Sequence, residues 1–316
     1  MDRRSFLRSS SVAIAAAGLA GPGMLAEGKN AKIKDKPEPF KINMPDTPGG
    51  LHLRFLGTGG ADWRGADKNA AYYRRCSSIL LERRILVDFT SYSEDMVPEV
   101  CTPGIIFYTH SHSDHYSPSA ALKCGVRKAY VGATWFVRAV RDFTAASVET
   151  GLPMPQIIPL EVGQRVEEGD IAFTALPSNH GTSDPSEQTL MYLIQKGPVR
   201  LMYATDTGGI PFHAARIAGI DKHFKGPEGI TGLIMEASMG LDYDEEWHIF
   251  NHSSVGTVLR TVHVLQDTGL YHPAEGQPVF LTHMMRRLHG TQEELDATLP
   301  SPLVAAYDGL EVCFSA

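Results

Sequence analysis

The sequence has few cysteines, no long apolar run after its first residues and no excess of positive charge. Its 316 residues include four cysteines, and their spacing contains no CxxC metal motif. No apolar stretch after the N-terminus is long enough to span a bilayer. Acidic residues number 36 against 29 basic ones, giving a net charge of −7 and arguing against a dedicated nucleic-acid binder. The chain is still long enough to bury the core of one large domain.

The four cysteines leave the redox state of the protein open. An exported protein could pair some of them, and four cysteines allow three full connectivities, among which the sequence does not choose. Cys76 stands beside an apolar stretch, so we expect a buried small residue there rather than a metal ligand. The other cysteines are Cys101, Cys124 and Cys313.

Residues 1–26 are typical of a targeting segment. Arg3 and Arg4 match the pair of a twin-arginine export signal, and a short Ala-rich apolar stretch follows at residues 12–20. A membrane-anchoring helix or a basic tail is the alternative. We expect an exported, periplasmic or extracytoplasmic protein that uses the twin-arginine machinery, with its signal cleaved or kept as an anchor. Residues 27–50 predict a linker or arm, and residues 51–316 predict a single domain.

One six-residue run carries most of the information in the chain, and it reads His110-Ser111-His112-Ser113-Asp114-His115. Because residues i and i+2 of an extended backbone point the same way, His110 and His112 can hold one cation together. Asp114 and His115 follow on a turn and can face a second cation. Imidazoles mixed with carboxylates suit zinc, iron or manganese rather than calcium. A chance cluster in a polar loop is the alternative.

Apolar runs bounded by polar turns predict an alternation of strands and helices. Strands are expected at residues 51–56, 78–81, 85–88, 105–108, 127–131, 171–176, 190–194, 199–204, 230–235, 279–282 and 310–314. Helices are expected after Ser117, with Pro118 at the first position, and at residues 134–146 and 253–266. Three of these strands run directly into candidate ligands: the H-x-H-x-D-H run, Asp206 and His283.

The chain resembles the metallo-β-lactamase superfamily of dinuclear metal hydrolases, nearest to the branch of ribonuclease Z and the phosphonate-pathway cyclic phosphodiesterase. The resemblance covers about residues 51–314. Besides the H-x-H-x-D-H run, it rests on residues 55–60, 75–78, 85–88, 179–181, 203–207, 235–237, 251–254 and 281–283. It implies an α/β fold, a four-layer αββα sandwich.

The resemblance also implies two divalent metal ions, with zinc expected first and manganese or iron as alternatives. The ligands would be His110, His112 and His180 for one metal, Asp114, His115 and His283 for the other, and Asp206 as the bridge. Neutral imidazoles leave the cations strongly Lewis acidic, and a water between them loses a proton near neutral pH to become the nucleophile. His289 competes with His283 for the last position, and we favour His283 because it directly follows a strand.

His252 distinguishes the classes of substrate. In ribonuclease Z-like enzymes a histidine at this place contacts the scissile phosphate and protonates the leaving oxygen, and a Glu at the end of the preceding strand, here Glu236, orients it. A phosphodiester needs such donors and an acid for its leaving group. The resemblance therefore gives Asp114, His252 and Glu236 as catalytic residues. Alternatively, residues 251–253 merely cap the following helix and Glu236 is a satisfied buried carboxylate.

Four further residues lie near the expected site. Asp62, Trp63 and Asp67 follow Gly60 on a loop that borders the active site in this fold, although a solvated polar loop is the favoured interpretation. Asp88 could hydrogen-bond a ligand such as His110 or His112, or form a turn at its strand end.

The chain departs from its apparent relatives in two ways. It has no basic Gly- and Pro-rich arm of the kind that clamps tRNA, and no early Cys-rich zinc site. We therefore predict an exported dinuclear hydrolase that acts on a small or cyclic phosphodiester, an anionic small molecule, through a metal-bridging hydroxide. No stable nucleic-acid partner is expected, and the oligomeric state stays open, a homodimer included. The alternatives are a lactone, ester or amide hydrolase that does not need His252, and a non-catalytic metal-binding protein of the same fold.

Overall fold

The structure, a computed structural model, describes residues 47–316 except 71, 226–228 and 245–246. The expected export signal and almost all of the expected arm lie outside the described residues. None of the helices in the described part is long and apolar enough to cross a membrane.

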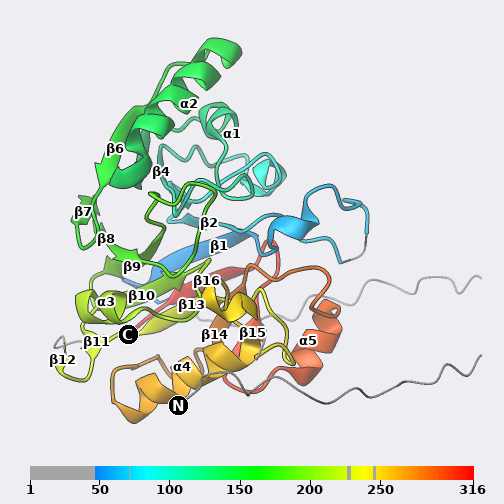
Figure 1. The fold of residues 1–316 in the computed structure, drawn as a ribbon, viewed down its shortest axis with the longest axis vertical. Helices are drawn as coiled ribbons and strands as arrows, with labels where there is room; N and C mark the ends of the chain where they lie inside the picture. Colours follow the sequence, from blue (N-terminus) through cyan, green and yellow to red (C-terminus); the bar gives the residue numbers. More distant parts are fainter. Residues whose placement is uncertain (1–46, 71, 226–228, 245–246) are drawn as a thin grey trace, which may run out of the picture. The chain divides into compact units, whose positions relative to one another are not determined.

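Two seven-stranded sheets make up the centre of the described chain (Figure 1). The first sheet has the order β16 (Glu311–Phe314), β1 (Leu51–Gly57), β2 (Ser78–Leu81), β3 (Ile85–Val87), β4 (Ile105–Phe107), β5 (Lys128–Gly132) and β6 (Gln156–Leu160). The second has the order β15 (Leu303–Ala305), β14 (Val279–Thr282), β13 (Gly232–Glu236), β10 (Val199–Ala204), β9 (Leu190–Lys196), β8 (Ile171–Pro177) and β7 (Arg165–Glu168). A small hairpin joins β11 (Ile220–Asp221) to β12 (Phe224–Lys225).

The two sheets pack face to face, and helices cover their outer faces. In β1, Leu51, Leu53 and Phe55 point into the core between the sheets, because alternate residues of a strand face the same side. The rings of Phe107 and Phe173, one from each sheet, stack with centroids 3.8 Å apart. The outer layers are α1 (Pro118–Lys123) and α2 (Phe136–Thr150) on the first sheet, and α3 (Phe212–Ile217), α4 (Val255–Asp267) and α5 (Gln292–Thr298) on the second. The predicted αββα sandwich is confirmed.

The predicted strands are all present, with ends that shift by at most two residues. Ser117 caps α1 as expected, with its hydroxyl accepting a hydrogen bond from the Ala120 amide. The sequence interpretation missed β6, β7, β11, β12, β15, α3 and α5. It also missed the 3₁₀ turns Ala61–Trp63, Glu94–Met96, Ala133–Trp135 and Trp247–Phe250.

The strand order brings the candidate ligands to one edge of the sandwich. Strands β10, β13 and β14 are parallel neighbours, so the residues that follow them emerge together. Strands β3 and β4 are also parallel, and they lead to Asp88 and to the H-x-H-x-D-H run. Asp88, Asp206 and His283 have φ angles of 54°, 48° and 53°, a left-handed conformation that is costly for residues other than glycine. Among the described residues other than glycine, only Glu82 and Arg83, on the β2–β3 turn, share this conformation.

Candidate metal centre

Three histidines form the first half of the site. The Nδ1 atom of His112 lies 3.0 Å from Nε2 of His110 and 3.2 Å from Nε2 of His180. The outer Nδ1 of His180 donates to the carbonyl of Asn251 at 3.1 Å, so its Nε2 faces the other rings as a lone pair. His112 can place at most one proton among these three nitrogens, so a cation among them would relieve the repulsion between the remaining lone pairs. This geometry fits the first predicted ligand set.

The second half gathers Asp114, His115 and His283. One carboxylate oxygen of Asp114 lies 3.4 Å from Nε2 of each histidine. The outer Nδ1 of His115 contacts Asp88 at 2.8 Å, and the outer Nδ1 of His283 contacts the Ser238 hydroxyl at 2.7 Å. Each ring therefore has its outer nitrogen fixed and its inner nitrogen aimed at the same small space, as metal-ligating histidines do.

Asp206 lies between the two halves. One of its oxygens is 3.1 Å from His115 Nε2, and the other is 3.4 Å from His283 Nε2 and 3.7 Å from His180 Nε2. Burial would raise the pKa of Asp206, but His115 and His283 lower it well below its usual value. A buried, ionised carboxylate in contact with both halves suits the bridging position.

The charges of the site test whether a cation fits. Burial lowers the pKa of His110 well below its ordinary value, so the ring is neutral, which is the form that binds metals. Burial also opposes a charge on His115, but the carboxylates of Asp206, Asp114 and Asp88 raise its pKa well above the ordinary value. The position therefore favours a positive charge, which a proton or a metal ion can supply. The Nε2 of His115 is buried and makes no hydrogen bond with any described residue. These residues fit a divalent cation.

The structure thus brings all seven predicted ligands into one cluster, whose overlapping groups of three could hold metal ions. We call these seven residues the ligand cluster: His110, His112, Asp114, His115, His180, Asp206 and His283. The rival candidate His289 is outside it and donates from Nε2 to the Ala237 carbonyl at 2.5 Å.

His252 stands beside both halves of the ligand cluster. Its Nδ1 lies 3.0 and 3.1 Å from the two carboxylate oxygens of Glu236, which is fully buried. Its ring is 4.8 Å from the ring of His180 and stacks against that of His283 at 5.7 Å between centroids. Burial lowers the pKa of His252, but Glu236 outweighs burial and raises it to about 9. The ring therefore carries a proton at neutral pH.

The alternative in which residues 251–253 cap the helix was wrong. Helix α4 begins at Val255, and its cap is Ser254, whose hydroxyl accepts from the Thr257 amide at 3.0 Å. The Ser253 hydroxyl instead donates to the carbonyl of Thr207 at 2.7 Å. His252 lies before the helix, so helix capping does not explain why a histidine is there.

The loop after Gly60 is not the solvated segment that we favoured. The carboxylate of Asp62 accepts hydrogen bonds from the amides of Arg286 and Arg287, and the buried Trp63 donates to the Met284 carbonyl at 2.8 Å. These contacts hold the segment that follows His283. Asp67 does match the expectation, because its carboxylate only closes a turn with Asn69.

Asp88 contacts His115 rather than His110 or His112, so that detail of the prediction was wrong. Its two oxygens also accept hydrogen bonds from the amide and hydroxyl of Thr109, next to the H-x-H-x-D-H run. Asp88 therefore orients one candidate ligand and anchors the start of the run.

Two residues with an evident role at this site were missed from the sequence. Glu187 is buried in the segment after His180, and its carboxylate accepts from the amide and hydroxyl of Ser111 at 2.7 and 2.6 Å. The Ser238 hydroxyl lies between His283 and Glu236 and donates to the Glu236 carboxylate. The only available signal was that each polar residue lies close to a predicted ligand or strand end.

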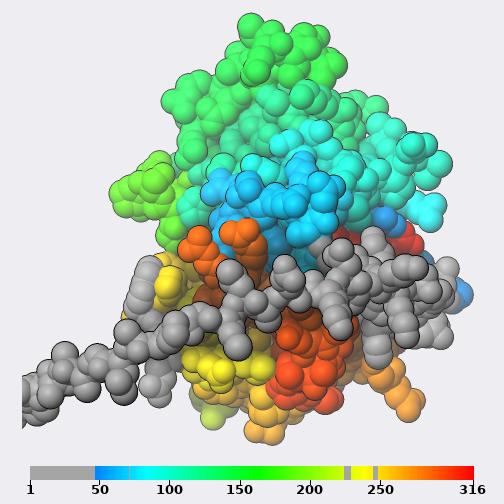
Figure 2. Space-filling model, turned by 90° about the vertical axis from the view of Figure 1, so that its right-hand side faces the viewer, coloured from blue at the N-terminus to red at the C-terminus, as the bar shows by residue number. Residues whose placement is uncertain are grey.

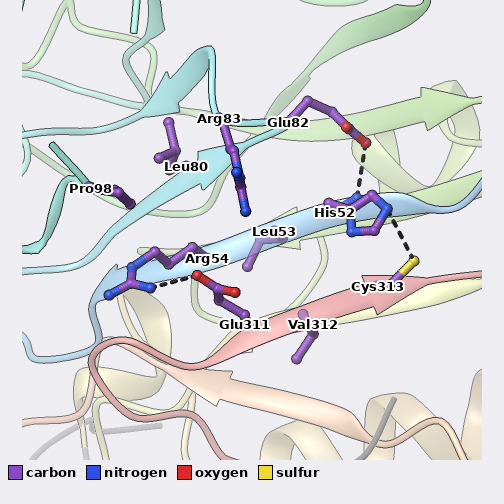
Figure 3. Close-up of a pocket in the computed structure, with 10 residues that line it drawn as sticks. All are labelled: His52, Leu53, Arg54, Leu80, Glu82, Arg83, Pro98, Glu311, Val312 and Cys313. Carbon is purple, nitrogen blue, oxygen red and sulfur yellow. Dashed lines mark hydrogen bonds and ion pairs between the residues drawn. The ribbon is translucent and has the colours of Figure 1, made fainter. Parts of the chain in front are cut away.

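A hollow of about 430 Å³ opens on the outer face of the first sheet (Figure 3). In it, Arg54 pairs with Glu311 at 2.5 Å, and Cys313 lies with its sulfur 3.8 Å from Nε2 of His52. It contains no residue of the ligand cluster. All four cysteines are free thiols, and Cys76 is buried as expected, with burial raising its pKa to about 12.

Comparisons with known proteins agree with this geometry. The sequence model of one protein family, described as the β-lactamase superfamily domain, matches residues 92–283, which is more than half of the chain. A search of curated proteins gave no match.

Solved structures share the fold. A diphosphatase of the PhnP family has a TM-score of 0.56 at 18% identity, over 84% of this chain and 100% of that one. The short form of human tRNase Z has a TM-score of 0.58 at 13% identity, over 84% and 100%. Zinc-bound PqqB from Methylobacterium extorquens has a TM-score of 0.60 at 14% identity, over 83% and 99%. At these identities the likeness is one of fold.

Proposed function

The chain belongs to the metallo-β-lactamase superfamily, and from this premise we propose that it is a dinuclear metal-dependent hydrolase of a small or cyclic phosphodiester. The observation that carries the proposal is the position of His252, whose Nδ1 is held by the buried carboxylate of Glu236 beside both halves of the ligand cluster. A hydrolase of lactones or carboxylic esters would use the same ligands but has less need of a fixed acid there.

Each residue has a chemical task in this proposal. When bound, two divalent ions, zinc in the first place as in PqqB, supply an activated water and polarise the phosphate. Glu236 accepts a hydrogen bond from Nδ1 of His252 and so fixes the orientation of the ring. His252 can then give its Nε2 proton to the leaving oxygen and stabilise the charge that develops on the phosphate. Asp114 and Asp206 offset the charge of the two cations.

The location of the protein belongs to the same proposal. We infer export from the Arg3-Arg4 pair and the short apolar stretch that follows it. The twin-arginine route carries folded proteins, which would let this chain take up its metals before export. An exported protein does not meet tRNA, so a small anionic substrate suits this location better.

The test is hydrolysis of a 2′,3′-cyclic nucleotide, whose leaving alkoxide needs a proton, by metal-loaded protein, beside Asp206→Ala and His252→Ala. Asp206→Ala should lose both metal and turnover. His252→Ala should keep its metal content and lose about 10²–10³-fold in kcat on the diester, with little loss on a lactone or p-nitrophenyl acetate. His263→Ala, an exposed histidine on α4, is the matched control.

A pH profile separates proton donation from a structural role. The rate should fall as pH rises toward about 9, since His252 must carry a proton, and bound cations would move this limb to lower pH. The limb should be missing in His252→Ala. A protein that holds two metals and hydrolyses lactones or esters but no diester would sink the phosphodiesterase proposal.

A further inference from the structure

Two loops are fastened together at the side of the ligand cluster that contains His283. They are residues 60–66 after β1 and residues 284–288 after β14. The Asp62 carboxylate accepts from the amides of Arg286 at 2.8 Å and Arg287 at 3.3 Å, and the Gly60 amide donates to Met284 at 3.1 Å. On the face shown in Figure 2, the blue segment after β1 and the orange segment after β14 lie next to each other.

This pair of loops touches the candidate ligands directly. A Cβ added to Gly60 would lie 3.3 Å from the ring of His283. The guanidinium of Arg64 donates from Nη1 to the hydroxyl of Ser113, the residue between His112 and Asp114. Whatever the two loops bind will therefore lie at the edge of the ligand cluster.

Three arginines on these loops have exposed side chains: Arg64, Arg286 and Arg287. We call them the arginine rim. Within the described part of the chain, none of them forms an ion pair with a carboxylate, which is also true of the exposed Arg83 and Arg127. The nearby carboxylate of Asp62 is engaged by two backbone amides. What sets the arginine rim apart is its place, because its three exposed residues share the two loops that border the ligand cluster.

Guanidinium groups suit one kind of ligand. Their donors form a planar fork that matches phosphate and carboxylate, and a cluster of like charges raises the local concentration of anions. Three unpaired arginines scattered over the surface would be solvated and would need no explanation. Here they share two mutually fastened loops, and one of them contacts the loop of the ligands.

We propose that the arginine rim binds a second anionic group of the substrate, a phosphate or carboxylate separate from the scissile phosphate. The inference rests on the proposed function for the position of the scissile group. It narrows the substrate to a small molecule with at least two anionic centres and makes the rim a determinant of specificity.

The test measures binding rather than turnover. Metal-loaded protein is titrated calorimetrically with alkyl phosphates of three to six carbons, and with the α,ω-bisphosphates and ω-carboxyalkyl phosphates of the same lengths. At one length or more, the doubly anionic ligand should bind at least tenfold more tightly than the alkyl phosphate. The better of the two doubly anionic series identifies the second group. Raised salt should reduce the advantage.

Variants locate the effect. In Arg64→Gln/Arg286→Gln/Arg287→Gln, the ratio of the two Kd values should fall to about one, while the Kd of the alkyl phosphate stays within twofold. Arg83→Gln is the matched control, because Arg83 is an exposed arginine on the β2–β3 turn that forms no ion pair with a described carboxylate, and it should leave both values unchanged.

Two results would overturn the rim: a ratio near one in the unaltered protein, or an equal loss of affinity for both ligand types in the triple variant. The second result would mean that the arginines support the loop of the ligands. Failure of the proposed function looks different, because alkyl phosphates would not bind at all. Bisphosphate binding that depended on the three arginines would then still establish the rim.

Discussion

The ligand cluster and the hollow of Figure 3 both contain histidine, acidic residues and neighbouring polar atoms, yet they differ in what those atoms face. In the ligand cluster the outer ring nitrogens are hydrogen-bonded and the inner ones face each other across a small space. In the hollow most charged side chains are paired, since Arg54 pairs with Glu311 and Glu82 pairs with Lys196 at 2.6 Å, and only Arg83 has no ion pair with a described residue. The two places therefore differ in the direction of their polar atoms.

The two places also differ in how much their polar groups cost the stability of the fold. The ligand cluster buries acidic and basic groups almost completely, which costs stability. Left-handed conformations do not separate the two places, because Asp206 and His283 have them in the cluster and Glu82 and Arg83 have them in the hollow. The hollow leaves the side chains of Arg54 and Glu311 28% and 60% exposed, at little cost. A fold keeps costly arrangements where they serve a ligand, so the comparison can be tested by disturbing each place in turn.

Glu187→Ala should have the largest effect on metal affinity among the substitutions that leave every ligand in place. Glu187 fastens Ser111, between His110 and His112, to the segment that follows His180, so its loss frees two parts of the first half to move apart. We expect about a 10–100-fold loss of metal affinity at the first site, because second contacts of metal ligands have effects of that size. Competition with a chromogenic chelator measures it.

The matched control is Glu311→Ala in the hollow, which should leave both metal affinities unchanged. Unaltered affinity in Glu187→Ala would mean that the first half is held by its own loop alone, and the contrast between the two places would weaken.

How far the sequence predicts this site depends on whether the information is local. Four candidate ligands lie in one six-residue run, and Asp206 and His283 follow apolar strands, so the pattern marked them as candidates and the resemblance supplied their expected roles. Glu187 gave no such signal. In the sequence it is one acid in a polar segment, and only the packing of the loops buries it against Ser111. Residues whose role is to hold other residues are visible only once the chain is folded.

The same reasoning explains the errors in the fold. Strand β6 shows no alternation of buried and exposed residues, so its pattern could not be recognised. Helix α5 is different, because Thr291 and Glu294 form a capping box that the sequence displays and that was overlooked. The sequence offers two serines, Ser253 and Ser254, as the cap of α4. Only the folded structure shows that Ser253 contacts Thr207, which leaves Ser254 as the cap and His252 before the helix.

A smaller effect is expected at His289, which lies beside the ligand cluster. Burial lowers its pKa to about 4, against about 6.5 in an unfolded chain. As pH falls below about 6.5 the unfolded state takes up the proton first, so stability present above that pH is lost progressively toward pH 4. His289→Gln keeps a hydrogen-bond donor for the Ala237 carbonyl. Between pH 7 and pH 5, the variant should lose about 1–2 kcal/mol less free energy of unfolding than the unaltered protein.

Urea unfolding of both proteins in the presence of a chelator measures this, because chelation keeps metal release out of the comparison. Parallel loss of stability in the two proteins would show that His289 is not a source of acid sensitivity on this side of the molecule.

The smallest effect should come from the hollow. Arg54→Gln/Glu311→Gln removes an ion pair whose side chains are both partly exposed, and such pairs contribute about 0–1 kcal/mol because solvent screens them. The free energy of unfolding in urea should change by less than about 1 kcal/mol, and metal content and turnover should not change. A large loss of turnover would show that the hollow affects the ligand cluster. The pairing of its charged side chains would then no longer indicate that a cavity has no part in function.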